Sequence, residues 1–220
     1  LNEPGGVGGR FLRREQPSLE AQLCNLADEI AYNAHDIDDG VRSGLITLAQ
    51  LADVPLFDHY RRVAQAEHPH LVGAAMERRL LYEAIRRMLS AQVYDVIEAT
   101  SAALASAAPR SVADVRLAAT PVGFSAPMRA PPSELKRFLF KNLYRHPQVV
   151  ETTGRAQRVV TELFAAYVAE PREMKPRFTR QALEGEPSAR ARAVADFIAG
   201  MTDRFAGREH ERLTGLRLLG

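Results

Sequence analysis

Three polar residues recur at intervals of four along one stretch of the chain, namely Asp28, Tyr32 and Asp36. Side chains four residues apart lie above one another on one face of an α-helix, so these three would form a row. Carboxylate oxygens suit hard or borderline divalent cations. Because one carboxylate cannot hold a catalytic metal alone, Asp28 would need further ligands, which are not evident elsewhere in the sequence.

The simpler interpretation of this stretch is a solvated acidic face near a helix end, and spacing alone favours it. Tyr32 would then be a half-buried residue with its hydroxyl at the surface. The adjacent pair His35-Asp36 is a weak metal signal, since neighbouring residues point about 100° apart on a helix.

Basic residues are clustered rather than evenly spread. An acidic metal-binding face opposite arginines is what a phosphoryl site needs, because metal and guanidinium together offset phosphate charge. The alternative is that these arginines lie on ordinary solvated helix faces. The sequence contains no phosphate-binding glycine loop and no Gly-x-Ser-x-Gly nucleophile motif. The clusters are Arg61-Arg62, Arg78-Arg79, Arg86-Arg87, and the group Lys136, Arg137, Lys141 and Arg145.

The composition is that of an ordinary globular protein. The 220 residues are 46% hydrophobic and 25% charged, enough for one large domain or two small ones. The chain has 29 basic and 27 acidic residues and a net charge of +2. This overall charge does not indicate binding to nucleic acid or to a membrane. No run of about 18 apolar residues predicts a transmembrane helix.

The single cysteine, Cys24, excludes an intrachain disulfide and a thiolate zinc cluster. We expect it to be a small core residue. A chain without disulfides fits a reducing compartment, so a cytoplasmic location is expected. The first ten residues are glycine-rich and lack an initiator Met, which leads us to expect a piece of a longer protein.

Apolar residues at three- and four-residue steps predict an all-α fold. No strand-like alternation or Asn-Gly hairpin signal is present. Residues 1–16 are expected to be loop, and the proline-rich stretch 109–132 is expected to be irregular. Helices are predicted at about residues 17–39, 47–53, 56–67, 72–107, 133–144, 149–168 and 188–205.

Three segments resemble one enzyme family. PSLEAQLCNLADEIAYNAHDIDDGVRSGLI (17–46), LKRFLFKNLYRH (135–146) and DFIAGMTDRFA (196–206) are similar to deoxyguanosinetriphosphate triphosphohydrolases of the HD-domain superfamily. The resemblance covers about residues 17–212. It implies a helical HD-domain-like fold, with the chain as the C-terminal part of a larger enzyme. The implied organisation is an arm (1–16), the end of the catalytic domain (17–108) and a helical C-terminal domain (109–220).

The family cleaves a deoxynucleoside triphosphate (dGTP or another dNTP) to deoxynucleoside and triphosphate with a divalent metal such as Mg²⁺ or Mn²⁺. Its metal site is a His, a His-Asp pair and a distant Asp, and Asp28 matches the distant Asp. Tyr32 and Asp36 match the residues beside the sugar, Asp36 at the 3′-hydroxyl. Arg78, or alternatively Arg79, resembles an arginine that pairs with the phosphates. The other metal ligands and the catalytic residues are expected upstream of Leu1.

Two functions therefore remain open. The first is the C-terminal portion of a dNTP triphosphohydrolase, with the piece inactive by itself. The second is a non-catalytic helical module for regulation or oligomerisation, which binds nucleotide or single-stranded DNA through its arginines. The resemblance also implies a homo-oligomer with no membrane partner, and a dNTP or single-stranded DNA as an effector.

Overall fold

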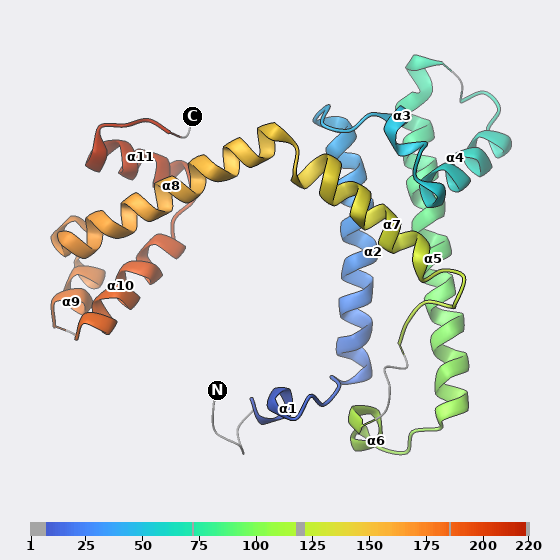
Figure 1. Cartoon of the computed structure of the whole chain (residues 1–220), viewed down its shortest axis with the longest axis horizontal. Coiled ribbons are helices and arrows are strands. Elements are labelled where there is room, and N and C mark those ends of the chain that lie inside the picture. Colours follow the sequence, from blue (N-terminus) through green and yellow to red (C-terminus); the bar gives the residue numbers. More distant parts are fainter. Residues whose placement is uncertain (1–7, 72, 118–121, 185, 219–220) are drawn as a thin grey trace. The chain divides into compact units, whose positions relative to one another are not determined.

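The computed structural model describes residues 8–71, 73–117, 122–184 and 186–218. Within these ranges the chain forms helices and turns and contains no strand, which confirms the predicted all-α class (Figure 1). The chain divides into two compact units, Leu1–Arg145 and His146–Gly220.

The first unit is built around two long helices, α2 (Leu19–Arg42) and α5 (Glu77–Ala107), which pack side by side (Figure 1). A third helix, α7 (Ala130–Leu139), packs on α2 and continues into a π-helical turn, η2 (Phe140–Tyr144). The remaining elements are α1 (Gly9–Leu12), α3 (Leu48–Leu51), α4 (Pro55–Glu67), the 3₁₀ turn η1 (Ala74–Met76) and α6 (Val112–Leu117).

Helix α2 has defined signals at both ends. The Ser18 hydroxyl accepts a hydrogen bond from the Ala21 amide at 3.4 Å and caps the first turn. The chain leaves the helix through Gly44, whose φ of +75° is a left-handed conformation that favours glycine. Gly40 lies buried inside α2. A Cβ there would come within 2.7 Å of Ile46 Cδ1, so its lack of a side chain lets the following loop pack on α2.

One apolar core joins α2, α3, α4, α5 and α7. Each of its fully buried large side chains contributes about 1.5–3 kcal/mol relative to exposure. Because α7 adds residues to this core and packs on both α2 and α4, it belongs to the first unit. The division after Arg145 therefore differs from the expected boundary between residues 108 and 109. The buried residues include Ile37, Leu51, Phe57, Leu81, Met88, Leu135 and Leu139.

Several local expectations were wrong. Cys24 is exposed, because it lies about 120° around α2 from the buried Ile30. The stretch 109–132, expected to be irregular, contains α6 and the start of α7. Pro131 and Pro132 fit the first turn of α7, where a missing amide proton costs nothing. The arm expected at 1–16 includes the short helix α1, and its residues 1–7 lie outside the described residues.

The second unit contains α8 (Pro147–Ala169), the 3₁₀ turn η3 (Pro171–Glu173), α9 (Pro176–Glu184), α10 (Pro187–Ala199) and α11 (Asp203–Thr214). The single helix expected at 188–205 is broken, since α10 ends at Gly200 and the Thr202 hydroxyl caps α11. The core of this unit surrounds Tyr167, Leu163, Val194 and Phe197.

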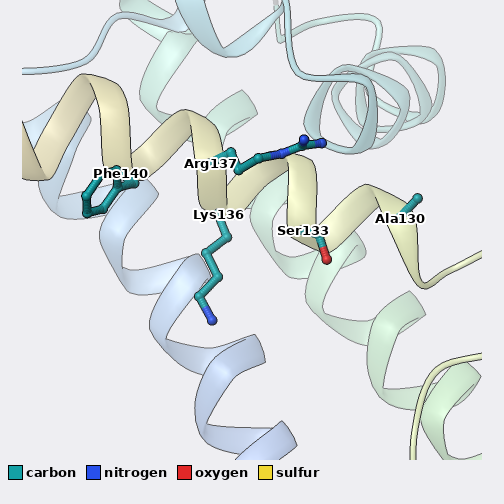
Figure 2. Close-up of a pocket in the computed structure, with 5 residues that line it drawn as sticks. All are labelled: Ala130, Ser133, Lys136, Arg137 and Phe140. Carbon is teal, nitrogen blue, oxygen red and sulfur yellow. The ribbon is translucent and has the colours of Figure 1, made fainter.

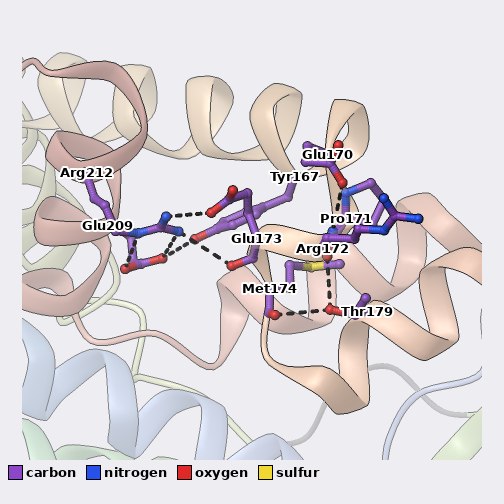
Figure 3. Close-up of polar contacts among 9 residues, drawn as sticks. All are labelled: Tyr167, Glu170, Pro171, Arg172, Glu173, Met174, Thr179, Glu209 and Arg212. Atoms are coloured by element: carbon purple, nitrogen blue, oxygen red, sulfur yellow. Dashed lines mark hydrogen bonds and ion pairs between the residues drawn. The ribbon is translucent and has the colours of Figure 1, made fainter.

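A buried phenol ties the second unit together at its polar edge (Figure 3). The hydroxyl of Tyr167, a fully buried side chain, donates to Glu209 Oε2 at 2.7 Å. Glu209 is also paired with Arg212, which contacts Glu173 Oε2 at 2.6 Å. The guanidinium therefore joins α11 to η3, while the phenol joins α11 to α8.

Replacing Tyr167 with Phe removes a hydrogen bond to a charged acceptor without removing the ring. The second unit should lose about 1.5–3 kcal/mol of unfolding free energy, the usual range for such a bond. Urea denaturation measures this loss. The matched control is Tyr94→Phe, because Tyr94 on α5 is 66% exposed. Equal stability of Tyr167→Phe and wild type would contradict the assignment.

The same cluster makes stability depend on pH. Arg212 lowers the pKa of Glu209 in the folded state below the ordinary value of 4.5. This contribution is fully present above pH 4.5 and is lost as the pH falls through the lower folded pKa. Glu209→Gln should therefore lose less stability than wild type between about pH 5 and pH 3, as measured by urea unfolding at each pH. Parallel pH profiles for the two proteins would refute this.

Candidate functional site

The row of Asp28, Tyr32 and Asp36 lies on α2 away from the residues that face the core. Asp28 is exposed, Tyr32 is 56% exposed and Asp36 is half-buried. The buried side of the same helix carries Ile30 and Ile37. The helix thus keeps the row at the surface, and Asp36 is the least exposed of its three residues.

A second tyrosine reaches this row from far along the sequence. The Tyr144 hydroxyl donates a hydrogen bond to Asp36 Oδ2 at 2.6 Å. Burial raises the Tyr144 pKa, and hydrogen bonds with Asp36 and Tyr32 raise it further, so this phenol stays protonated. Burial also raises the Asp36 pKa, which the bond from Tyr144 opposes. Tyr32, Asp36 and Tyr144 therefore form one polar cluster.

The π-helical turn η2 explains how Tyr144 reaches α2. In a regular α-helix, Tyr144 would lie about 80° around the axis from Lys136, eight residues earlier. The Arg145 amide donates to the Phe140 carbonyl at 3.0 Å, the five-residue spacing of a π-turn, which adds one residue to that turn. The extra residue removes about 100° of rotation. Lys136 and Tyr144 then lie within about 20° of each other around the helix axis.

Lys136 makes a second contact from α7 to α2. Its Nζ lies 3.3 Å from Glu29 Oε1, next to Asp28 in the sequence. Figure 2 shows the Lys136 side chain extending toward α2, whereas Arg137 points elsewhere. A surface hollow of about 620 Å³ is lined by Lys136 and Phe140, together with Ala130, Ser133 and Arg137. Lys136 and Tyr144 therefore contact α2 at Glu29 and Asp36, near the two ends of the row.

Arg78 is placed apart from the row. Its guanidinium donates to the Tyr82 hydroxyl, with Nη2 at 3.1 Å, and it lines a hollow of about 400 Å³ with Asp38 and Arg42. Asp38 points about 160° away from Asp36 around α2. The structure thus brings Tyr32 and Asp36 together and leaves Arg78 against another face of the helix. Arg79, the alternative candidate, is also exposed on α5.

Most of the other basic clusters are engaged by carboxylates. Asp58 pairs with both Arg61 and Arg62, at 2.5 and 2.7 Å. Arg86 pairs with Glu83, and Arg87 pairs with Glu67. These pairs support the interpretation of ordinary charged helix faces for two of the three clusters on α4 and α5, and Arg78-Arg79 is the exception.

The described residues do not complete a metal site. No group of three or more His, Cys, Asp or Glu side chains within the described ranges is arranged to hold a metal ion. Asp28 is an exposed carboxylate beside Glu29, and Glu29 is paired with Lys136. The donor set of this chain therefore does not fit a metal by itself, and Asp28 can supply one ligand at most.

Sequence reasoning missed Tyr144 as a site residue. The residue lay inside one of the segments that carried the resemblance, but helical spacing gave it no role. Its contact with Asp36 spans 108 positions and depends on the π-turn. A π-turn has no periodic signal in the sequence, so this pairing could only be found in three dimensions.

Comparison with known proteins places the chain in a family. The Phosphohydrolase-associated domain family matches residues 122–212. The chain is 49% identical to a deoxyguanosinetriphosphate triphosphohydrolase-like protein of Ralstonia nicotianae, over 98% of the chain and 54% of the relative. It is 52% identical to a protein of the same description from Bordetella pertussis, over 95% of the chain and 52% of the relative.

These similarities cover nearly all of the chain, including both the α2 row and the segment that carries Tyr144. The chain spans about half the length of the curated relatives it matches. Among the described residues, no helix has both the length and the apolar character needed to cross a bilayer. On this evidence, the chain belongs to the family of deoxyguanosinetriphosphate triphosphohydrolase-like proteins.

Proposed function

We propose that this chain is the C-terminal half of an enzyme that hydrolyses a deoxynucleoside triphosphate to deoxynucleoside and triphosphate. The observation that carries the proposal is about 50% identity, over nearly the whole chain, to relatives described as triphosphohydrolase-like. One water is consumed, and the bond between the sugar 5′-oxygen and the α-phosphorus is broken.

Each residue of the row has a proposed role toward this substrate. Asp28 supplies one oxygen ligand to a divalent cation, and the remaining ligands come from the part of the protein outside this chain. The ring of Tyr32 lies against the sugar and leaves no room for a larger substituent on its 2′ carbon, which favours deoxynucleotides. Asp36 accepts a hydrogen bond from the 3′-hydroxyl. A bound divalent cation would offset negative charge on the phosphates.

Arg78 stays a proposed partner of the triphosphate, with Arg79 as the alternative. A guanidinium can bind phosphate oxygens through two parallel hydrogen bonds and would stabilise charge on the triphosphate. In the structure, however, the guanidinium of Arg78 lies beside Tyr82 and Asp38 rather than beside the row.

Partners and location follow from the family resemblance alone. We propose a homo-oligomer that acts in the cytoplasm and responds to a dNTP or single-stranded DNA as an effector. The alternative function, a non-catalytic nucleotide- or DNA-binding module, depended on free basic clusters. Pairing of Arg61, Arg62, Arg86 and Arg87 with carboxylates weakens that alternative.

The 220-residue chain should be inactive when it is purified alone. One carboxylate does not retain a catalytic metal, and the described residues form no cluster that would add to it. Release of inorganic triphosphate from dGTP in the presence of Mn²⁺ measures this. Turnover by the isolated chain above the no-enzyme rate would refute the proposal that essential ligands lie elsewhere.

In the whole protein, Asp28→Ala should lower turnover by more than about 100-fold, because even residues that only orient a metal ligand cost 10- to 100-fold. Triphosphate release and bound metal content are measured together. Asp53→Ala serves as the matched control, since Asp53 is an exposed carboxylate in the turn between α3 and α4. Near-normal turnover and metal content in Asp28→Ala would remove Asp28 from the site.

A further inference from the structure

The contact between Tyr144 and Asp36 links two elements that do not otherwise share a chemical role. Asp36 lies on α2, and Tyr144 ends the π-turn η2. A phenol hydroxyl at 2.6 Å from a carboxylate oxygen is a short, charge-assisted hydrogen bond. The proposed function assigns Asp36 to the sugar 3′-hydroxyl, so the effect of this bond on the Asp36 carboxylate matters for sugar recognition. The following inference rests on that proposed function.

The bond fixes one oxygen of a carboxylate that has two. Rotation of an aspartate carboxyl group about its last torsion is broad and nearly two-fold, so an unpartnered Asp36 would not direct its oxygens. Tyr144 binds Oδ2. Within the described part of the chain, no hydrogen bond is recorded to the other oxygen, Oδ1. Oδ1 is thus held in one direction and remains able to accept a hydrogen bond.

The surroundings strengthen this hold. Asp36 is half-buried and Tyr144 is 38% exposed, so both groups are partly withdrawn from water. Hydrogen bonds are electrostatically stronger where the local dielectric is lower than that of water. The neighbouring Tyr32 side chain also raises the pKa of the Tyr144 phenol.

We propose that Tyr144 is a positioning residue for sugar recognition: its hydroxyl binds Asp36 Oδ2 and so directs Oδ1 toward the 3′-hydroxyl of a deoxynucleotide. Tyr144 acts through Asp36 and does not touch the substrate. The π-turn serves this role, because it turns the Tyr144 side chain to the face of η2 that meets α2. The specificity conferred is for a sugar that carries a 3′-hydroxyl.

The test compares Tyr144→Phe with wild type in the whole protein, using a dNTP and the matching 2′,3′-dideoxynucleoside triphosphate. Loss of the phenol hydroxyl should raise KM for the dNTP about tenfold, the lower end for a hydrogen bond to a charged group. KM for the dideoxy substrate, which has no 3′-hydroxyl, should change less than twofold. The preference for dNTP over the dideoxy analogue should therefore fall about tenfold, with kcat less affected.

Tyr94→Phe on α5 is the matched control, because it removes a phenol hydroxyl from a residue that is 66% exposed and distant in sequence from the row. An equal rise in KM for both substrates would indicate a merely structural effect and overturn the inference, as would an unchanged preference. If wild-type protein turns over neither substrate, the proposed function itself fails. Circular dichroism of each variant confirms that it is folded.

A binding measurement gives a readout that does not need turnover. Titration calorimetry of the whole protein with a deoxynucleoside and its 2′,3′-dideoxy counterpart reports the 3′-hydroxyl contact alone. Wild type should bind the deoxynucleoside more tightly, and Tyr144→Phe should lose most of that difference. An equal affinity ratio in the two proteins would contradict the role assigned to Tyr144.

Discussion

The arrangement of the candidate site depends on the hydrogen bond between Tyr144 and Asp36. It joins the surface of α2 to the end of η2 across 108 positions of the chain. Leu135 and Leu139 hold α7 in the same core as Ile37 of α2, so apolar packing sets where η2 begins. Packing fixes the helices, the π-turn sets the direction of Tyr144, and the phenol then orients the carboxylate.

Under the proposed function, this chain supplies only part of the active site. The row on α2 presents an exposed carboxylate, a phenol and a half-buried carboxylate. The proposed function assigns the phenol and the half-buried carboxylate to the sugar end of a nucleotide. The described residues supply no complete set of metal ligands, and Arg78 lies on another side of α2. Since the chain spans about half the length of its relatives, the proposed function places the other metal ligands in the rest of the protein.

The sequence predicted the helices well where apolar spacing and breakers agreed, as for α4 and for the end of α5 at Ala107. It failed to separate α10 from α11, because Ile198, Met201 and Phe205 keep helical spacing across the break and all pack on the second core. Prolines at the start of α7 were mistaken for a loop. The row on α2 was found from its four-residue spacing, but the partner of Asp36 was not, because an inserted residue in η2 changes the face on which Tyr144 lies.

The most direct test of this account is a crystal structure of the whole protein with a non-hydrolysable dNTP analogue. We expect the sugar 3′-hydroxyl to donate to Asp36 Oδ1 while Tyr144 remains bonded to Oδ2, with Asp28 among the ligands of a divalent cation. A sugar bound away from Asp36, or a Tyr144 hydroxyl turned away from the carboxylate when the analogue is bound, would contradict the account.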